Sequence, residues 1–306
     1  MNLREWALPV YTILMQLSVG SMAALWIIRA VFLPRFGEEE LERVMRNPVA
    51  ILVITILTAM IGSFFHLSRP WLAFMSLINL DKSWLSREIV FTVLLFGAVV
   101  VLWFLQAHVD HQTWIKTLLG WAAIVFGLFA TYCMTQLYLL PTQASWDTPF
   151  TILSFYSSMV LLGMAATITM LAVGMQYTLI QNPQDIGVQP QIIRHSLPGF
   201  GLATIFMMLA ILAQYGFLIQ TLSAGDSTAQ ASLELYLGLY QPLLIIRLGT
   251  MIAGAGWLVV AIVRTQRDQI SIKSFTFHAY MACLLLLVGE ILGRFLFYAT
   301  HIRLGI

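Results

Sequence analysis

Two ionisable side chains lie at the facing ends of two long apolar segments of this sequence. His66 ends one segment and Glu88 begins the next, and a polar, aromatic connection separates them. An imidazole exchanges protons near neutral pH, and partial burial makes a carboxyl group a stronger proton acceptor. Such a pair could accept the two protons that a lipid-soluble quinol releases on oxidation. The quinol ring would stack near Trp71, Trp84, Phe64 or Phe65.

Other polar residues of the same stretch could support this chemistry. Ser86 and Arg87 precede Glu88, and Arg69 follows His66. The arginines could tune the charge of the carboxyl group or contact a partner. A purely structural interpretation stays open, in which His66 caps a helix C-terminus and Glu88 stabilises a helix N-terminus.

The composition indicates that membrane helices position these residues. Of 306 residues, 59% are hydrophobic and 10% are charged, whereas soluble domains carry about 25% charge. The net charge of +2 does not indicate a nucleic-acid partner. Membrane spans need about 20 apolar residues, so we expect an all-α, polytopic helix bundle that forms a single domain over residues 1–306. Eight spans are predicted, at 7–32, 49–66, 88–107, 115–140, 150–180, 198–223, 242–263 and 275–299.

Basic residues predict the orientation of the bundle, because Lys and Arg concentrate in cytoplasmic connections. The odd-numbered connections and their edges hold Arg29, Arg35, Arg43, Arg46, Lys116, Arg194, Arg264, Arg267 and Lys273. The termini and the even-numbered connections hold Arg4, Arg69, Lys82, Arg87 and Arg303. We therefore expect both termini on the outer, periplasmic side. The first connection has mixed charge and is expected to form a short surface helix.

Three ionisable residues fall inside the last two predicted spans. Arg247 lies about one turn from a span end, and Glu290 and Arg294 are four residues apart on one helix face. Because such residues are costly in the hydrocarbon, they are usually paired or functional, and we expect a supporting polar network. Alternatively, Glu290 and Arg294 form a structural ion pair and Arg247 extends to the headgroups.

Small residues are expected where helices approach closely. Gly163, Gly254 and Gly256 fall within predicted spans, and glycine allows two membrane helices to pack backbone to backbone.

The sequence predicts no redox centre within the chain. Cys133 and Cys283 are too few for an iron–sulfur cluster or a zinc site. A b-type haem needs two facing axial ligands within the bilayer, and the remaining histidines lie at or beyond span ends. These histidines are His108, His111, His195, His278 and His301. We expect no haem, no iron–sulfur cluster and no metal.

Two motifs resemble one protein family. The segments HLSRP, LINL and SWLSREI, together with GEILGRFLFY at 289–298, are similar to the membrane-anchor subunits of bacterial dimethyl sulfoxide reductase-type molybdoenzymes. The similarity extends over the full length, in helix count, order and connections. The sequence departs from the family at Ser68, where Gly is more common.

The resemblance implies a menaquinol-oxidising anchor in the bacterial inner membrane. Such an anchor has no redox centre of its own. It docks a four-cluster iron–sulfur subunit, which feeds a molybdopterin catalytic subunit. The family's quinol-site histidine and carboxylate correspond to His66 and Glu88. The polar and aromatic residues Arg69, Trp71, Trp84, Ser86 and Arg87 would complete the quinol pocket.

Two other functions remain open from the sequence. A related quinone-reactive anchor for polysulfide, tetrathionate or nitrite chemistry would share these features and differ in its partner. A proton-coupled transporter would use the ionisable residues as a proton path. Transporters often show inverted repeats and broken helices near the membrane midplane, and the sequence shows neither clearly.

Overall fold

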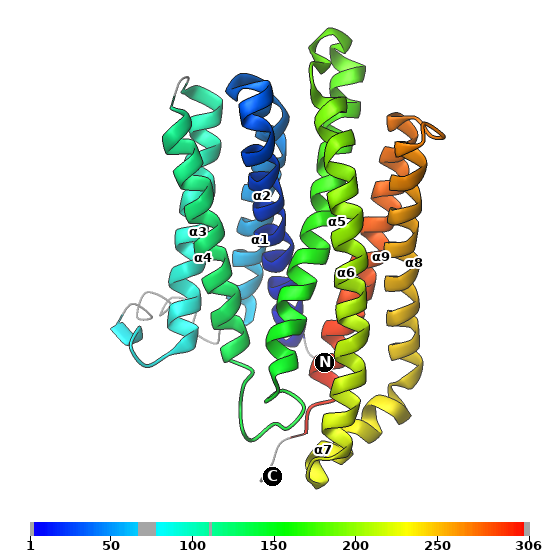
Figure 1. Ribbon diagram of the computed structural model, residues 1–306. Coiled ribbons are helices and arrows are strands. Elements are labelled where there is room, and N and C mark those ends of the chain that lie inside the picture. Colours follow the sequence, from blue (N-terminus) through cyan, green and yellow to red (C-terminus); the bar gives the residue numbers. More distant parts are fainter. Residues whose placement is uncertain (1–2, 67–77, 110–111, 303–306) are drawn as a thin grey trace.

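The protein folds into long helices that run side by side (Figure 1). The computed structural model describes residues 3–66, 78–109 and 112–302, and the side chains of all of these except 3–6, 65, 66 and 272. The long helices are α1 (Leu3–Phe36), α2 (Glu38–His66), α3 (Trp84–His108), α4 (Thr113–Gln136), α5 (Pro149–Gln181), α6 (Gln189–Ser223), α8 (Gln241–Gln266) and α9 (Ile272–Ala299). The short elements are the 3₁₀-helix η2 (Pro183–Ile186), α7 (Ser227–Glu234) and the π-helical turn η3 (Leu235–Leu239).

The prediction of an all-α membrane bundle is confirmed. Within the described ranges, eight helices are long and apolar enough to cross a membrane, and no strand occurs. The first turn of α1 and the last turn of α9 lie at the same end of the bundle, together with α7 (Figure 1). We call this the lower end. Its assignment to the outer membrane face stays a prediction from the distribution of Lys and Arg.

The first connection differs from the expected short surface helix. Helix α2 begins at Glu38, directly after Gly37, and continues through Pro48 into the span. Gly37 has a φ of 80°, a conformation that glycine adopts without strain. Leu41 and Met45 are fully buried, so the first turns of α2 pack against the core instead of lying on the surface.

The bundle consists of two halves joined mainly where α1 packs against α5. Helices α1–α4 form the N-terminal half, and α5, α6, α8 and α9 form the C-terminal half. At the crossing, a Cβ atom at Gly163 would collide with the backbone of Gly20, and one at Gly20 with the backbone of Met159. The Ser21 hydroxyl also donates a hydrogen bond to the Gly163 carbonyl, 3.2 Å away. The prediction for Gly163 is therefore confirmed.

The other two predicted contact glycines behave differently from each other. A Cβ at Gly254 would lie 3.0–3.1 Å from Leu285 and Leu286 of α9, so this glycine does allow a close approach. A Cβ at Gly256 would meet nothing within 4 Å. The prediction for Gly256 is wrong, because this residue lies on a face of α8 that no neighbouring helix covers.

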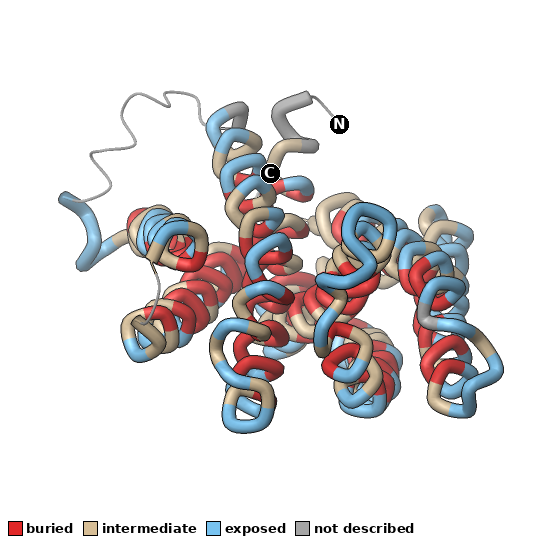
Figure 2. The backbone as a smooth tube through the Cα atoms, turned by 90° about the horizontal axis from the view of Figure 1, so that it is seen from above, coloured by how far each residue is buried: buried red, intermediate tan, exposed pale blue. Residues whose placement is uncertain are grey.

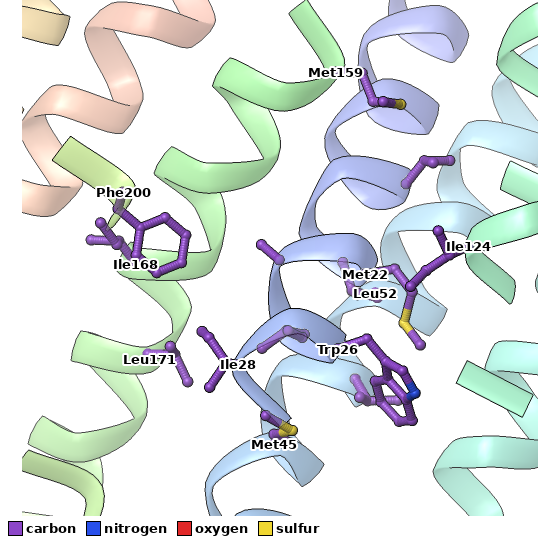
Figure 3. Packing of buried hydrophobic residues seen from close by; sticks show 14 of the residues in the cluster. Met22, Trp26, Ile28, Met45, Leu52, Ile124, Met159, Ile168, Leu171 and Phe200 are labelled. Atoms are coloured by element: carbon purple, nitrogen blue, oxygen red, sulfur yellow. The ribbon is translucent and has the colours of Figure 1, made fainter. Parts of the chain in front are cut away.

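Buried residues line the faces that the helices turn toward one another, and exposed residues line the outside (Figure 2). Many of the exposed residues are large and apolar, as expected for a surface in contact with lipid. The main core gathers around α1, where Ile28 lies opposite Leu171 of α5 and Trp26 is fully buried (Figure 3).

Candidate functional site

A cavity of about 400 Å³ lies within the N-terminal half, among the first turns of α1 and α3 and the last turns of α2 and α4. We call it the Glu88 cavity. It is lined by Leu8, Tyr11, Thr12, Ser63, Leu85, Glu88, Ile89, Met134, Leu137 and Tyr138. These residues come from all four helices of the half and from the connection after α4. Most of the wall surface is apolar, and one carboxyl group and several hydroxyl groups interrupt it.

The start of α3 holds Glu88 in this wall. The Ser83 side chain accepts a hydrogen bond from the Ser86 amide, 3.3 Å away, and so caps the helix. Glu88 is 5% exposed and interacts with the Tyr11 hydroxyl group. That hydroxyl also forms a 3.1 Å hydrogen bond with Thr92 one turn further along α3. Glu88 is thus a buried carboxyl group with hydroxyl neighbours.

Arg87 and Trp84 brace the turn before α3. Arg87 donates hydrogen bonds of 2.7 Å to the carbonyl oxygens of Leu80 and Asp81. Its guanidinium group lies 4.3 Å from the centre of the Trp84 ring, which packs edge-on against Tyr132 of α4. Trp84, Ser86 and Arg87 are not among the residues that line the Glu88 cavity. Of the predicted pocket residues whose side chains are described, Glu88 is the one on its wall.

Three predicted pocket residues fall partly or wholly outside the described part of the protein. Arg69 and Trp71 lie in the undescribed range 67–77. His66 is the last residue of α2, and its side chain is not described. Ser63, one helical turn earlier, lines the Glu88 cavity. The backbone of α2 therefore ends close to this cavity.

The predicted polar network forms a separate buried cluster in the C-terminal half. Arg247, Glu290 and Arg294 are 6%, 1% and 3% exposed. A guanidinium nitrogen of Arg247 lies 3.8 Å from Glu290 Oε2, which also accepts a 2.7 Å hydrogen bond from the Ser158 hydroxyl. Arg294 donates a 2.9 Å hydrogen bond to Gln16 Oε1 of α1.

This arrangement differs from the structural alternative considered for the three residues. Glu290 pairs across the helix interface with Arg247, and the Arg247 side chain is buried rather than extended to the surface. Gly293 makes room for this pairing, because a Cβ atom there would collide with the Arg247 guanidinium group. The spacing of GEILGR in α9 thus places a carboxylate, a gap and a second guanidinium on one face.

A small cavity of about 50 Å³ adjoins this cluster. We call it the C-terminal cavity. Arg247, Glu290 and Arg294 line it, and so do Ser145 and Thr148 from the connection between α4 and α5. Two cations share one carboxylate on its wall, so the cavity has an excess of positive charge.

Sequence reasoning missed the tyrosines of the Glu88 cavity. Tyr11 is a polar residue within the apolar run that forms α1, and this is a weak signal. Tyr138 follows the apolar run of α4, a position where an aromatic residue is common at a membrane interface. Its hydroxyl group instead forms a short hydrogen bond with that of Tyr298 on α9.

A second buried ionic cluster lies at the opposite end of the N-terminal half. Lys116 is fully buried, with its amine 2.7 Å from Glu42 and 3.7 Å from Glu38. Arg29 lies 3.7 Å from Glu38, and Thr113 donates a short hydrogen bond to the same carboxylate. Two cations and two carboxylates balance there, which is typical of a cluster that joins α1, α2 and α4.

Helix number, apolar surface and buried polar clusters define a polytopic membrane protein of the helix-bundle class. The model of the DMSO reductase anchor subunit (DmsC) family matches residues 1–300. The protein therefore belongs to this family of membrane anchors.

Three curated relatives match over nearly the whole sequence. An anaerobic dimethyl sulfoxide reductase subunit from Escherichia coli K12, named YnfH, is 26% identical over 311 residues, which cover 98% of this protein and 96% of the relative. An anaerobic dimethyl sulfoxide reductase subunit from Haemophilus influenzae is 24% identical, with 99% and 97% covered. A second such subunit from E. coli K12 is 23% identical, with 98% and 96% covered.

Proposed function

We propose that this protein oxidises menaquinol and passes the electrons to an iron–sulfur subunit of an anaerobic molybdopterin-dependent reductase, such as dimethyl sulfoxide reductase. One observation carries the proposal: a buried carboxyl group stands in the wall of a 400 Å³ cavity at one end of the bundle. That volume lies within the range of about 300–1,000 Å³ typical of small-molecule sites. Mostly apolar walls with a few polar groups suit a flat ring that carries two hydroxyl groups.

The proposed reaction has a simple balance. The quinol becomes a quinone and loses two protons and two electrons. Glu88 accepts one proton, and His66, at the end of α2 beside the cavity, accepts the other. Both electrons go to an iron–sulfur cluster of the partner subunit, which reduces the molybdopterin subunit. The redox centres belong to those partners, and this subunit contributes quinol binding and proton transfer.

Membership in the anchor family and the names of the relatives support this assignment. The proposed location is the bacterial inner membrane, with the lower end facing outward to dock the iron–sulfur subunit. Arg69 and Trp71 remain proposed pocket residues. Arg87 and Trp84, which brace the start of α3, would hold Glu88 in place. Polysulfide, tetrathionate or nitrite reductases would use the same site with another catalytic subunit.

Replacement of Glu88 tests the proposal in the complete membrane complex. A water-soluble menaquinol analogue serves as donor and dimethyl sulfoxide as acceptor. We expect Glu88→Gln to slow quinol oxidation about a hundredfold, because a positioned proton acceptor contributes roughly 10²–10⁴ to a rate. Glu234→Gln is the matched control, since this carboxylate at the lower end is exposed.

Two further measurements make the outcome specific. A reduced viologen dye, which delivers electrons to the iron–sulfur subunit directly, should support the wild-type rate in Glu88→Gln. His66→Ala should likewise impair quinol oxidation and spare assembly. Quinol turnover by Glu88→Gln within twofold of the control would refute the proposed role of the cavity.

A further inference from the structure

Arg294 stands between the two cavities of the molecule. It lines the C-terminal cavity, and it donates a hydrogen bond to Gln16 of α1. Gln16 follows Thr12 by four residues, so the two lie on one face of α1. Thr12 lines the Glu88 cavity. One guanidinium group therefore reaches from the C-terminal cavity to the helix that forms the wall of the other.

A pair of phenols makes a second link between the same regions. Tyr138 lines the Glu88 cavity, and its hydroxyl group is hydrogen-bonded to that of Tyr298. Tyr298 follows Arg294 by one turn of α9. The positive charge of Arg294 acts on both phenol groups. The hydroxyl pair is thus continuous with the Glu88 cavity on one side and lies close to Arg294 on the other.

The C-terminal cavity offers hydrogen-bonding atoms that the rest of the described structure does not use. Five buried atoms around it have no hydrogen-bond partner among the described residues: Arg247 Nε, Glu290 Oε1, Arg294 Nε, Ser145 Oγ and Thr148 Oγ1. A buried water needs roughly 10–15 Å³ and two to four polar partners, so 50 Å³ can hold a few waters. Ser145 and Thr148 belong to the connection at the lower end (Figure 1).

We propose that protons released in the Glu88 cavity leave it through the Tyr138–Tyr298 pair and the Arg294–Glu290 cluster, and reach the lower end through the C-terminal cavity. This inference rests on the proposed quinol oxidation. It gives the C-terminal half a function in a reaction whose substrate binds in the other half.

Each transfer in this relay conserves protons. Tyr298 gives its hydroxyl proton through bound water to Glu290 and takes the proton of Tyr138, and Glu290, which lines the C-terminal cavity, passes that proton to water there. Tyr138 in turn takes a proton from the Glu88 cavity, so one O–H bond forms on each phenol for each that breaks. The electrons leave separately to the partner's iron–sulfur cluster. Arg294 favours this order, because a cation stabilises a phenol oxygen that has partly lost its proton.

Conservative replacement of the phenols tests the relay in the complete complex. We expect Tyr138→Phe and Tyr298→Phe to lower the maximal rate of quinol oxidation about tenfold or more, below the general range for positioned proton transfer. The KM for quinol should stay within twofold, and the solvent deuterium isotope effect should rise. Tyr156→Phe is the matched control, because its hydroxyl group donates to the Leu128 carbonyl, 3.0 Å away, and lines neither cavity.

Three outcomes would overturn the relay. Rates and isotope effects of both phenylalanine variants that match the Tyr156→Phe control would remove the phenols from proton transfer. A raised KM at an unchanged maximal rate would assign Tyr138 to quinol binding instead. A loss of rate with viologen as well as quinol would assign both phenols to structure. In each case a slow Glu88→Gln variant would leave the proposed quinol site standing, whereas a fast one refutes that site itself.

Discussion

The two halves of this bundle bury carboxyl groups in opposite settings. Glu88 stands in a wide, mostly apolar cavity with hydroxyl neighbours, and no ion pair joins it to a described residue. Glu290 lies beside a cavity about one eighth as large, with Arg247 as its ion-pair partner and Arg294 nearby. The first setting has space for a molecule, and the second has fixed charge and space for water.

Burial of a charge therefore does not by itself identify a binding site. A paired carboxylate in a tight cluster stabilises one arrangement of the helices or conducts protons. An unpaired carboxylate beside a cavity can react with a bound ligand. The balanced Lys116 cluster at the other end of the molecule belongs with Glu290 in this respect. For this reason the proposed ligand site is the one in the N-terminal half.

The largest expected effect concerns the crossing that joins the halves. Gly163→Leu would force a side chain into the backbone of Gly20, and we expect loss of the folded subunit from the membrane, because α1 and α5 cannot separate without opening the core. The measurement is the amount of assembled complex after mild solubilisation. Gly174→Leu is the control on the same helix, since a Cβ there meets nothing within 4 Å. Equal yields of the two variants would contradict the packing argument.

The next effect separates stability from function. Arg247→Met leaves Glu290 buried without its ion-pair partner, which should destabilise the protein by about 3 kcal/mol or more. The double variant with Glu290→Met as well should recover much of this loss. Glu88→Leu should change the thermal unfolding midpoint little while it abolishes quinol oxidation. If Glu88→Leu destabilised the complex as much as Arg247→Met does, the two carboxyl groups would not differ in the way described.

The smallest effect is on quinol affinity. Ile89 lines the Glu88 cavity, so Ile89→Trp should reduce the room for the ring and raise the KM for quinol about tenfold, equivalent to about 1.4 kcal/mol. Leu94→Trp provides the control, because Leu94 lies on the exposed face of the same helix. Steady-state kinetics with quinol, and with viologen as a second donor, separate a binding effect from a folding effect.

Much of the fold could be predicted from the sequence, because each span is a continuous apolar run whose length the bilayer sets. The extension of α2 through Pro48 could not be predicted. It depends on the burial of Leu41 and Met45, which in turn depends on partners far away in the sequence. Arg247, Glu290 and Arg294 lie in one buried cluster, and their role as a network that supports the quinol site stays a prediction. The pairing of Glu290 with Arg247 rather than with Arg294 depends on the gap at Gly293 between α8 and α9, which the sequence does not reveal.

In the candidate site, too, some residues could be predicted from the sequence and others could not. Glu88 could be found from its position at a span start, where an acidic residue is costly unless it has a partner or a function. Tyr11 and Tyr138 could not, because their contacts with Glu88, Thr92 and Tyr298 bring together residues far apart in the sequence. An aromatic residue with a polar tip near a span end is common for reasons of interface alone.

The position of the bound quinol decides between the two halves of the bundle. A photoreactive menaquinone analogue is cross-linked to the complete complex, and the labelled peptides are identified by mass spectrometry, with excess unlabelled quinol as competitor. We expect competed labelling at Leu85, Ile89 or Met134, which line the Glu88 cavity. Competed labelling confined to residues around Arg247 and Tyr215 in the C-terminal half would contradict a quinol site at Glu88.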